Sequence, residues 1–301
     1  MSNGLRFGCL VLQNRPADEL VRAWHRVEAL GLDSLWVADQ LGSTARPDWP
    51  WFDGWTALGA MARETTTIRV GTLVASITLR APALLAKQAV TVDHLSGGRL
   101  ELGVGAGGTA LDHELLGEEP WPPRERTERF LEYVDVLDRL LRGEAGRFDG
   151  RYYRVADVVM QPRPVQSPRP PLTIAAWSPR NIRLAAEAAD AWNTMGGLGL
   201  DAAQGFEAVR RQSRLLDEAC EAIGRDPASI RRSLLLHEVW IAEEPFASEA
   251  AFLDLVERYR AVGIDEFLFY FPPEEWGRKT RVEPGLLERL AEEVLPELRA
   301  G

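Results

Sequence analysis

The chain has 301 residues, of which 46% are hydrophobic and 27% charged, and its formal net charge is -10 at pH 7. This balance is typical of a soluble globular protein and allows one large barrel or two domains. The acidic charge argues against a general nucleic-acid binder, because the phosphate backbone would be repelled. We find neither an apolar run of membrane-spanning length nor a secretory pattern at the start, so we expect a cytoplasmic enzyme without a membrane partner.

Metal ligands and nucleophiles are sparse in the sequence. No two of the four histidines stand at ligand spacing, so a catalytic metal is not expected. Cys9 and Cys220 are far apart and indicate neither a disulfide framework nor a cysteine metal site; we expect both to be reduced core residues. A Gly-x-Ser-x-Gly elbow is absent, which leaves a serine hydrolase of that type unsupported.

Apolar runs of strand length alternate with amphipathic segments of helical length along the chain. The predicted strands are residues 5–12, 34–38, 68–74, 100–104, 172–176, 191–194, 234–242 and 266–271. The predicted helices are residues 16–30, 52–63, 82–95, 125–141, 179–189, 202–223, 248–261 and 284–298. This order predicts an α/β fold with a parallel sheet closed into a single (β/α)8 TIM barrel over residues 1–301; an open doubly wound sheet is the alternative.

Residues 143–171 interrupt the alternation between the fourth helix and the fifth strand. Asp149 and Gly150 stand between aromatic residues and predict a hairpin turn. The prolines between Pro162 and Pro171 favour an extended, fairly rigid connection. Because long loops inside a barrel are usually functional, we interpret this segment as an insertion that covers part of the barrel mouth.

A glycine-rich stretch follows the fourth predicted strand. Gly97 and Gly98 end the preceding helix, and Gly105 to Gly108 come directly after the buried run 100–104. Such a loop lets backbone N–H groups approach a flat or anionic ligand at the carboxyl end of a strand. It is equally what a tightly packed βα loop needs, and the spacing alone leaves both interpretations open.

The residues that follow the strands form the mouth of a barrel and carry its chemistry. Here they offer backbone donors, the carboxylate of Asp39 and aromatic walls, which suits a bound aromatic cofactor that the protein positions. Without further information, Asp39 is a helix N-cap or a loop carboxylate. Trp49 and Trp51 are candidates for an apolar substrate wall, with His237 and Tyr270 as further substrate contacts.

Five ordered blocks resemble the luciferase-like monooxygenase superfamily, and most of all its branch that uses the deazaflavin coenzyme F420. These blocks are residues 31–39, 51–56, 68–74, 95–107 and 174–193. The resemblance covers roughly residues 5 to 195, and several blocks in order are far more specific than a single motif. It implies an eight-stranded barrel with an insertion, in agreement with the count of predicted elements.

The resemblance also implies a cofactor site. Asp39 would lie beside the cofactor ring, Leu73-Val74 would form a non-proline cis peptide behind it, and the glycine loop would pass under the cofactor side chain. Backbone N–H groups and a hydroxyl at the start of the fifth helix would meet its phosphate, where the helix dipole favours an anion. The implied cofactor contacts are Asp39, Leu73, Val74, Ala75, Gly105, Ala106, Gly107, Ala176, Trp177 and Ser178.

Two positions depart from the pattern of deazaflavin-dependent dehydrogenases. Some of these relatives place a basic histidine after the second-strand Asp, where this chain has Gln40, which can orient a substrate but cannot take a proton. They also place a glutamate acid after strand four, near Gly108 here. His113 is therefore our first candidate for proton transfer, with a surface histidine as the alternative.

The leading hypothesis is an oxidoreductase in which reduced F420 delivers hydride to an apolar small organic molecule. The alternative is an oxygenase that uses reduced FMN supplied by a separate reductase. A third hypothesis is a barrel that binds a ligand without turnover. Relatives commonly pair through early helices, so the resemblance also implies a homodimer.

Overall fold

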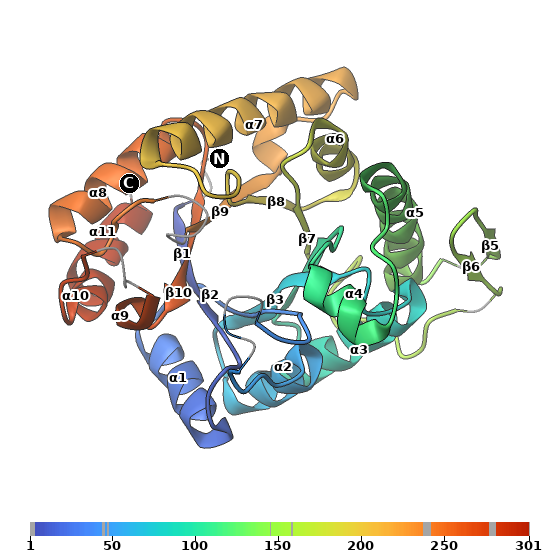
Figure 1. The fold of residues 1–301 in the computed structure, drawn as a ribbon, viewed down its shortest axis with the longest axis horizontal. Coiled ribbons are helices and arrows are strands. Elements are labelled where there is room, and N and C mark those ends of the chain that lie inside the picture. Colours follow the sequence, from blue (N-terminus) through green and yellow to red (C-terminus); the bar gives the residue numbers. More distant parts are fainter. Residues whose placement is uncertain are drawn as a thin grey trace. The chain divides into compact units, whose positions relative to one another are not determined.

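The computed structural model describes residues 4–43, 46, 48–144, 146–157, 159–236, 242–276 and 281–300. Eight strands close into a barrel in the order β1-β10-β9-β8-β7-β4-β3-β2 (Figure 1). The prediction of a (β/α)8 barrel is thereby confirmed, and the alternative of an open sheet is wrong. The barrel strands are β1 (Arg6–Val11), β2 (Ser34–Val37), β3 (Arg69–Ser76), β4 (Leu100–Gly105), β7 (Leu172–Ala175), β8 (Ala191–Thr194), β9 (Arg231–Leu236) and β10 (Glu266–Phe271).

Helices follow the strands, and all but two short ones lie at the positions that the amphipathic segments predict. They are α1 (Ala17–Ala29), α2 (Gly54–Glu64), α3 (Pro82–Ser96), α4 (Ala110–Leu116), α5 (Pro123–Arg142), α6 (Pro179–Ala188), α7 (Ala202–Ala222), α8 (Glu249–Arg260), α9 (Pro273–Trp276), α10 (Leu286–Arg289) and α11 (Leu295–Ala300). Local signals explain their ends: Asp53 caps α2, and Gly97, with φ of 66°, ends α3 in the left-handed conformation. Within the described ranges, no helix combines the length and apolarity needed to cross a membrane.

The chain divides into two compact units. One comprises Met1–Leu12, Ala23–Trp36 and Ala176–Gly301, and the other comprises Gln13–Arg22 and Val37–Ala175. In the first, β1, β10, β9 and β8 pair in parallel through buried apolar residues. In the second, β3, β4 and β7 do the same. Both cysteines are buried and free, as expected of core residues.

The structure differs from the predicted elements at several places. Strand β9 begins at Arg231 rather than at residue 234, because the Arg232 side chain is neutralised by Asp217 and bonded to Ser213 on α7 instead of ending the strand. Helix α4 was not predicted, since it is a short helix directly after the glycine loop. The predicted last helix is divided into α10 and α11 by a π-helical turn at Leu290–Val294.

The proline-rich end of residues 143–171 does not lie over the barrel mouth, and for the rest of the segment this placement stays a prediction. The Asp149-Gly150 hairpin is confirmed by the antiparallel strands β5 (Phe148–Asp149) and β6 (Arg154–Val155), which lie beside α5 (Figure 1). The proline-rich part, however, contacts the first residues of β3 and β4: Gln166 donates to the Leu100 carbonyl at 2.8 Å and accepts from Arg69 at 3.0 Å. The segment therefore contacts the amino ends of these strands, whereas the mouth lies at their carboxyl ends.

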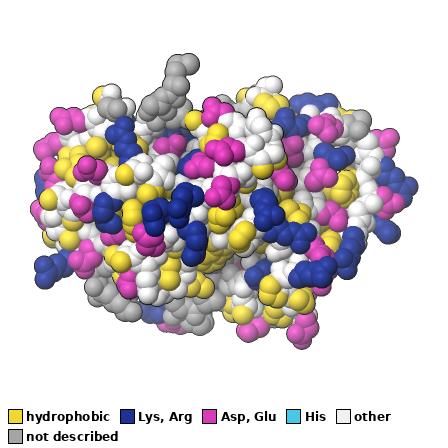
Figure 2. Space-filling model, turned by 90° about the horizontal axis from the view of Figure 1, so that it is seen from above, with side chains coloured by type: hydrophobic (Ala, Val, Ile, Leu, Met, Phe, Trp, Pro, Cys, Tyr) yellow, Lys and Arg dark blue, Asp and Glu magenta, His cyan; other side chains and the backbone are white. Residues whose placement is uncertain are grey.

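Acidic and basic side chains are interspersed on the face drawn in Figure 2 rather than sorted into patches of one sign. Helix α5 shows how the sequence produces such mixing, because Arg124, Arg139 and Arg142 each pair with a carboxylate four residues away. Pairs four residues apart on one helix face stabilise the helix slightly.

Asp265 gives the fold a testable pH dependence. Its side chain accepts from the Arg232 N–H at 2.8 Å at the start of β9, and burial raises the pKa of Asp265 to about 6. A raised folded-state pKa contributes stability that is present below the unfolded value and is lost as the pH rises through about 6. We expect Asp265→Asn to reduce the loss of unfolding free energy between pH 4 and pH 8 by on the order of 3 kcal/mol, since one pKa unit is about 1.4 kcal/mol. Denaturant titrations at both pH values measure it; equal losses in both proteins would contradict the assignment.

Candidate active site

The carboxylate of Asp39 follows β2 directly and is held by Arg80. Asp39 is 2% exposed, and both of its oxygens accept from the Arg80 guanidinium, with 3.0 Å between Nη2 and Oδ1. The Ser76 N–H donates to Oδ2 at 3.2 Å. Burial raises the pKa of Asp39, while the Arg80 pairing acts in the opposite direction. Asp39 is thus a buried, bidentate ion pair, and the N-cap of α2 is Asp53 instead.

A bulge in β3 faces the glycines of β4. The Leu73-Val74 peptide bond is cis, as the resemblance implies, and the register between β3 and β4 shifts between Thr72 and Ala75. A Cβ at Gly105 would lie 2.6 Å from the Val74 side chain. The missing side chain in β4 is therefore what leaves room for Val74.

The glycine loop continues past β4 with its backbone open. Ala106 is half-buried, whereas Gly107 and Gly108 are exposed. Gly107 has φ of 69°, and a Cβ there would lie 2.8 Å from the Ser76 hydroxyl oxygen. The loop therefore packs tightly against the end of β3, and its close approach to a ligand stays a prediction.

Four side chains fix the segment Ala38–Leu41 from different directions. Arg80 holds Asp39, and the Gln13 amide donates to the Ala38 carbonyl at 2.7 Å. The Trp51 indole N–H donates to the Gln40 carbonyl at 2.9 Å, and the Leu41 N–H donates to Asp112 Oδ1 at 2.8 Å. The end of β2 is consequently a rigid, polar corner.

Helix α4 carries two buried polar residues, of which Asp112 contacts this corner through Leu41 and His113 is its neighbour in sequence. Asp112 and His113 are each 1% exposed, so the alternative of a surface histidine is wrong. His113 packs edge-on against Trp121, with 5.7 Å between ring centroids. Asp112 Oδ2 and His113 Nδ1 are buried without a hydrogen-bond partner among the described residues. Burial and the charge of Asp39 raise the pKa of Asp112, while the backbone N–H of Leu41 lowers it.

The start of α6 corrects one of the implied phosphate contacts. The Ala176 N–H donates to the Asn193 carbonyl at 3.0 Å, so it is not free for a ligand. Ser178 is the N-cap of α6, and its hydroxyl oxygen accepts from the Asn181 N–H. Trp177 is 42% exposed. Of the three residues, Trp177 and Ser178 keep groups that an anion could meet.

The predicted substrate contacts are only partly described. Trp51 is half-buried and tied to Gln40, and Trp49 is half-buried beneath the Arg46 guanidinium, 4.7 Å from its ring centroid. Tyr270 is half-buried near the end of β10. His237 lies outside the described residues. Their contact with a substrate stays a prediction.

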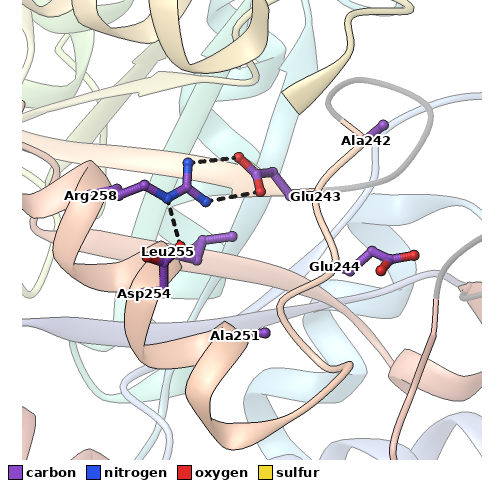
Figure 3. A pocket seen from close by; sticks show the side chains of 7 residues that line it. All are labelled: Ala242, Glu243, Glu244, Ala251, Asp254, Leu255 and Arg258. Atoms are coloured by element: carbon purple, nitrogen blue, oxygen red, sulfur yellow. Dashed lines mark hydrogen bonds and ion pairs between the residues drawn. The ribbon is translucent and has the colours of Figure 1, made fainter. Parts of the chain in front are cut away.

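A surface pocket of about 300 Å³ lies between the loop after β9 and α8 (Figure 3). Its carboxylates are largely neutralised by Arg258, which contacts both oxygens of Glu243 at 3.0 and 3.2 Å and Asp254 at 2.8 Å. A pocket whose charges satisfy one another in this way offers little to a ligand, and we do not assign the site to it.

The family model described as luciferase-like monooxygenase matches residues 5–288. The chain belongs to this family. It is 28% identical to an F420-dependent glucose-6-phosphate dehydrogenase of Amycolatopsis mediterranei, over 94% of this chain and 95% of the relative. The prediction of a luciferase-like oxidoreductase is confirmed.

Two solved structures share the fold of this luciferase-like chain. An F420-dependent secondary alcohol dehydrogenase in complex with an F420-acetone adduct superposes with a TM-score of 0.80 at 17% identity, covering 98% of this chain and 99% of the other. The monooxygenase RslO1 from Streptomyces bottropensis has a TM-score of 0.71 at 20% identity, covering 97% and 99%. The same barrel fold thus occurs in an F420-dependent dehydrogenase and in a monooxygenase.

The sequence pointed to Asp39, Val74, Gly105 and Gly107, which all lie around the end of β3. It did not point to Arg80, the partner that makes Asp39 a fixed group. The signal for Arg80 is a single arginine between the end of the third strand and Pro82, four residues beyond Ser76. Such a residue is found only when the whole loop after a strand is considered together with the strand's last residues.

Proposed function

We propose that this luciferase-like chain is an F420-dependent oxidoreductase that transfers hydride from the reduced coenzyme to an apolar small organic molecule. The observation that carries the proposal is the corner around the end of β3, where Val74 faces the side-chain-free Gly105 and the loop Gly107–Gly108 is exposed. A flat ring can approach exposed main chain of this kind closely, with the half-buried Val74 as its apolar contact.

The residues at this corner fit a deazaflavin. Gln13 Oε1 is a buried acceptor without a partner among the described residues, and a ring system that carries N–H groups can satisfy such an oxygen. Asp39, held by Arg80, would line the ring. When bound, the reduced deazaflavin supplies the hydride, while this chain binds it, orients it and excludes water from it.

Within the unit that begins at Ala176, the start of α6 suits an anion such as the coenzyme phosphate. Ser178 and Pro179 begin this helix, whose dipole favours an anion at its first turn. The Ser178 hydroxyl can donate its proton while its oxygen continues to cap the helix. Trp177, exposed beside it, would cover the phosphate or the adjoining chain.

The substrate class rests on the composition of the corner beside Asp39. Gln40 cannot accept a proton, so abstraction from an alcohol has no base at that position. The half-buried Trp49 and Trp51 suit an apolar substrate. Reduction of a carbonyl-bearing or unsaturated molecule therefore agrees better with these residues than oxidation of a sugar phosphate.

Anaerobic turnover separates these possibilities. Reduced F420 is mixed with the protein and 2-cyclohexen-1-one or a simple ketone, and its reoxidation is followed by absorbance; glucose 6-phosphate with oxidised F420 is run in parallel. We expect reoxidation with the enone or ketone and no reduction by the sugar phosphate. Oxygen uptake with reduced FMN, in the absence of any F420 reaction, would overturn the proposal in favour of an oxygenase.

A further inference from the structure

Asp112 combines burial, a fixed carboxylate and a free oxygen at the corner described above. One oxygen, Oδ1, is occupied by the Leu41 N–H at 2.8 Å, which fixes the orientation of the carboxyl group. The other, Oδ2, is buried and has no hydrogen-bond partner among the described residues. A buried carboxyl oxygen without a partner costs free energy, so it indicates a group that meets a ligand or carries a proton.

We propose that Asp112 is the proton-exchanging residue of this site, a role deduced from its own contacts and resting on the proposed function. Leu41 lies two residues after Asp39, so the carboxyl of Asp112 is tied to the same segment that carries the ion pair. The charged groups that face it are Asp39, which disfavours its ionisation, and His113, which favours it. Burial acts in the same direction as Asp39, so the pKa of Asp112 lies above its ordinary value.

The proton balance of an enone reduction shows what Asp112 would do. A hydride supplied by the reduced coenzyme would form the new C–H bond at the β carbon, and the π pair of the C=C bond would move toward the carbonyl to give an enolate. Asp112 then gives its proton to the enolate and becomes a carboxylate. Asp112 would regain a proton from solvent, and the balance would close because the reduced coenzyme would supply one hydride and one further proton. The sum is one hydride and one proton added to the substrate.

The Asp112→Asn variant separates this role from a purely structural one. Its amide keeps an oxygen for the Leu41 N–H but cannot exchange a proton, whereas Asp112→Ala loses both. We expect Asp112→Asn to lower turnover of 2-cyclohexen-1-one by roughly 100-fold or more, the range of general acid–base catalysis, while its affinity for F420 stays near that of the wild type. Glu114→Gln, an exposed carboxylate on the same helix, is the matched control and should turn over normally.

Infrared titration of the coenzyme-free protein provides a second readout. Because the pKa of Asp112 is raised, the carboxylic-acid C=O band in the wild type minus Asp112→Asn difference should persist to higher pH than the bands of exposed carboxyls. Absence of this band, or wild-type turnover by Asp112→Asn, overturns the role of Asp112. If the wild type binds no F420, it is the proposed function that fails, and the infrared band alone decides whether Asp112 carries a proton.

Discussion

Arg80→Ala is expected to destabilise the protein by about 3–5 kcal/mol, the usual cost of removing one partner from a buried ion pair. The Arg80 side chain is 6% exposed and that of Asp39 1%, so water cannot replace the guanidinium. Among the described residues, the Asp39 carboxylate would then depend on the Ser76 N–H, which donates to it at 3.2 Å. Denaturant unfolding followed by circular dichroism measures the loss.

The pH dependence of this loss provides its own check. Without Arg80, the pKa of Asp39 loses its main lowering interaction, so the carboxyl takes up a proton more readily. The destabilisation should therefore be larger at pH 8 than at pH 5. Arg46→Ala is the matched control, because its pair with Asp48 is exposed and solvent screens it, so a much smaller loss is expected. Equal losses for the two variants would show that Asp39 does not depend on Arg80.

Gly103→Ala is expected to cost at least about 3 kcal/mol, at the upper end of the range for overpacking a core. A Cβ at Gly103 would lie 2.1 Å from the Thr72 carbonyl oxygen and 3.0 Å from the Val74 side chain. Because the first of these atoms is backbone, it can move only if β3 and β4 separate. The change would also displace the Val74 bulge, so binding of F420 should weaken together with stability.

Gly59→Ala controls for the general effect of replacing glycine by alanine. Gly59 lies inside α2, and nothing lies within 4 Å of a Cβ built on it. Alanine is favoured over glycine inside helices, so we expect a gain of about 0.5–1 kcal/mol. Thermal and denaturant unfolding of both variants give the comparison. A Gly103→Ala protein as stable as the wild type would mean that β3 and β4 are not packed as described.

The barrel was predictable because strands buried on both faces and amphipathic helices leave different periodicities in the sequence. The Asp149-Gly150 hairpin was predictable from local turn chemistry alone. The position of residues 143–171 was not, because proline content fixes an extended backbone without saying what it contacts. Gln166 decides that position through tertiary bonds to Arg69 and Leu100.

The candidate site was likewise predictable only in part. Gly105 and Gly107 could be singled out from the sequence, because a glycine itself identifies a position without a side chain. The Asp39–Arg80 pair could not, because it joins residues that are 41 positions apart through two loop conformations. Asp112 and His113 could be noted in the sequence because they follow the glycine loop. Their burial could not be predicted, because it depends on helix α4, and the sequence of α4 shows no strong helical periodicity.

Whether the corner at the end of β3 holds a deazaflavin is decided by equilibrium binding of F420 and FMN to the purified protein, each followed by fluorescence, in the wild type and in Gly103→Ala. We predict selective binding of F420 by the wild type and weakened binding in the variant, because the coenzyme ring would rest where Val74 and Gly105 meet. Selective binding of FMN, or binding of F420 that Gly103→Ala leaves unchanged, would contradict this placement.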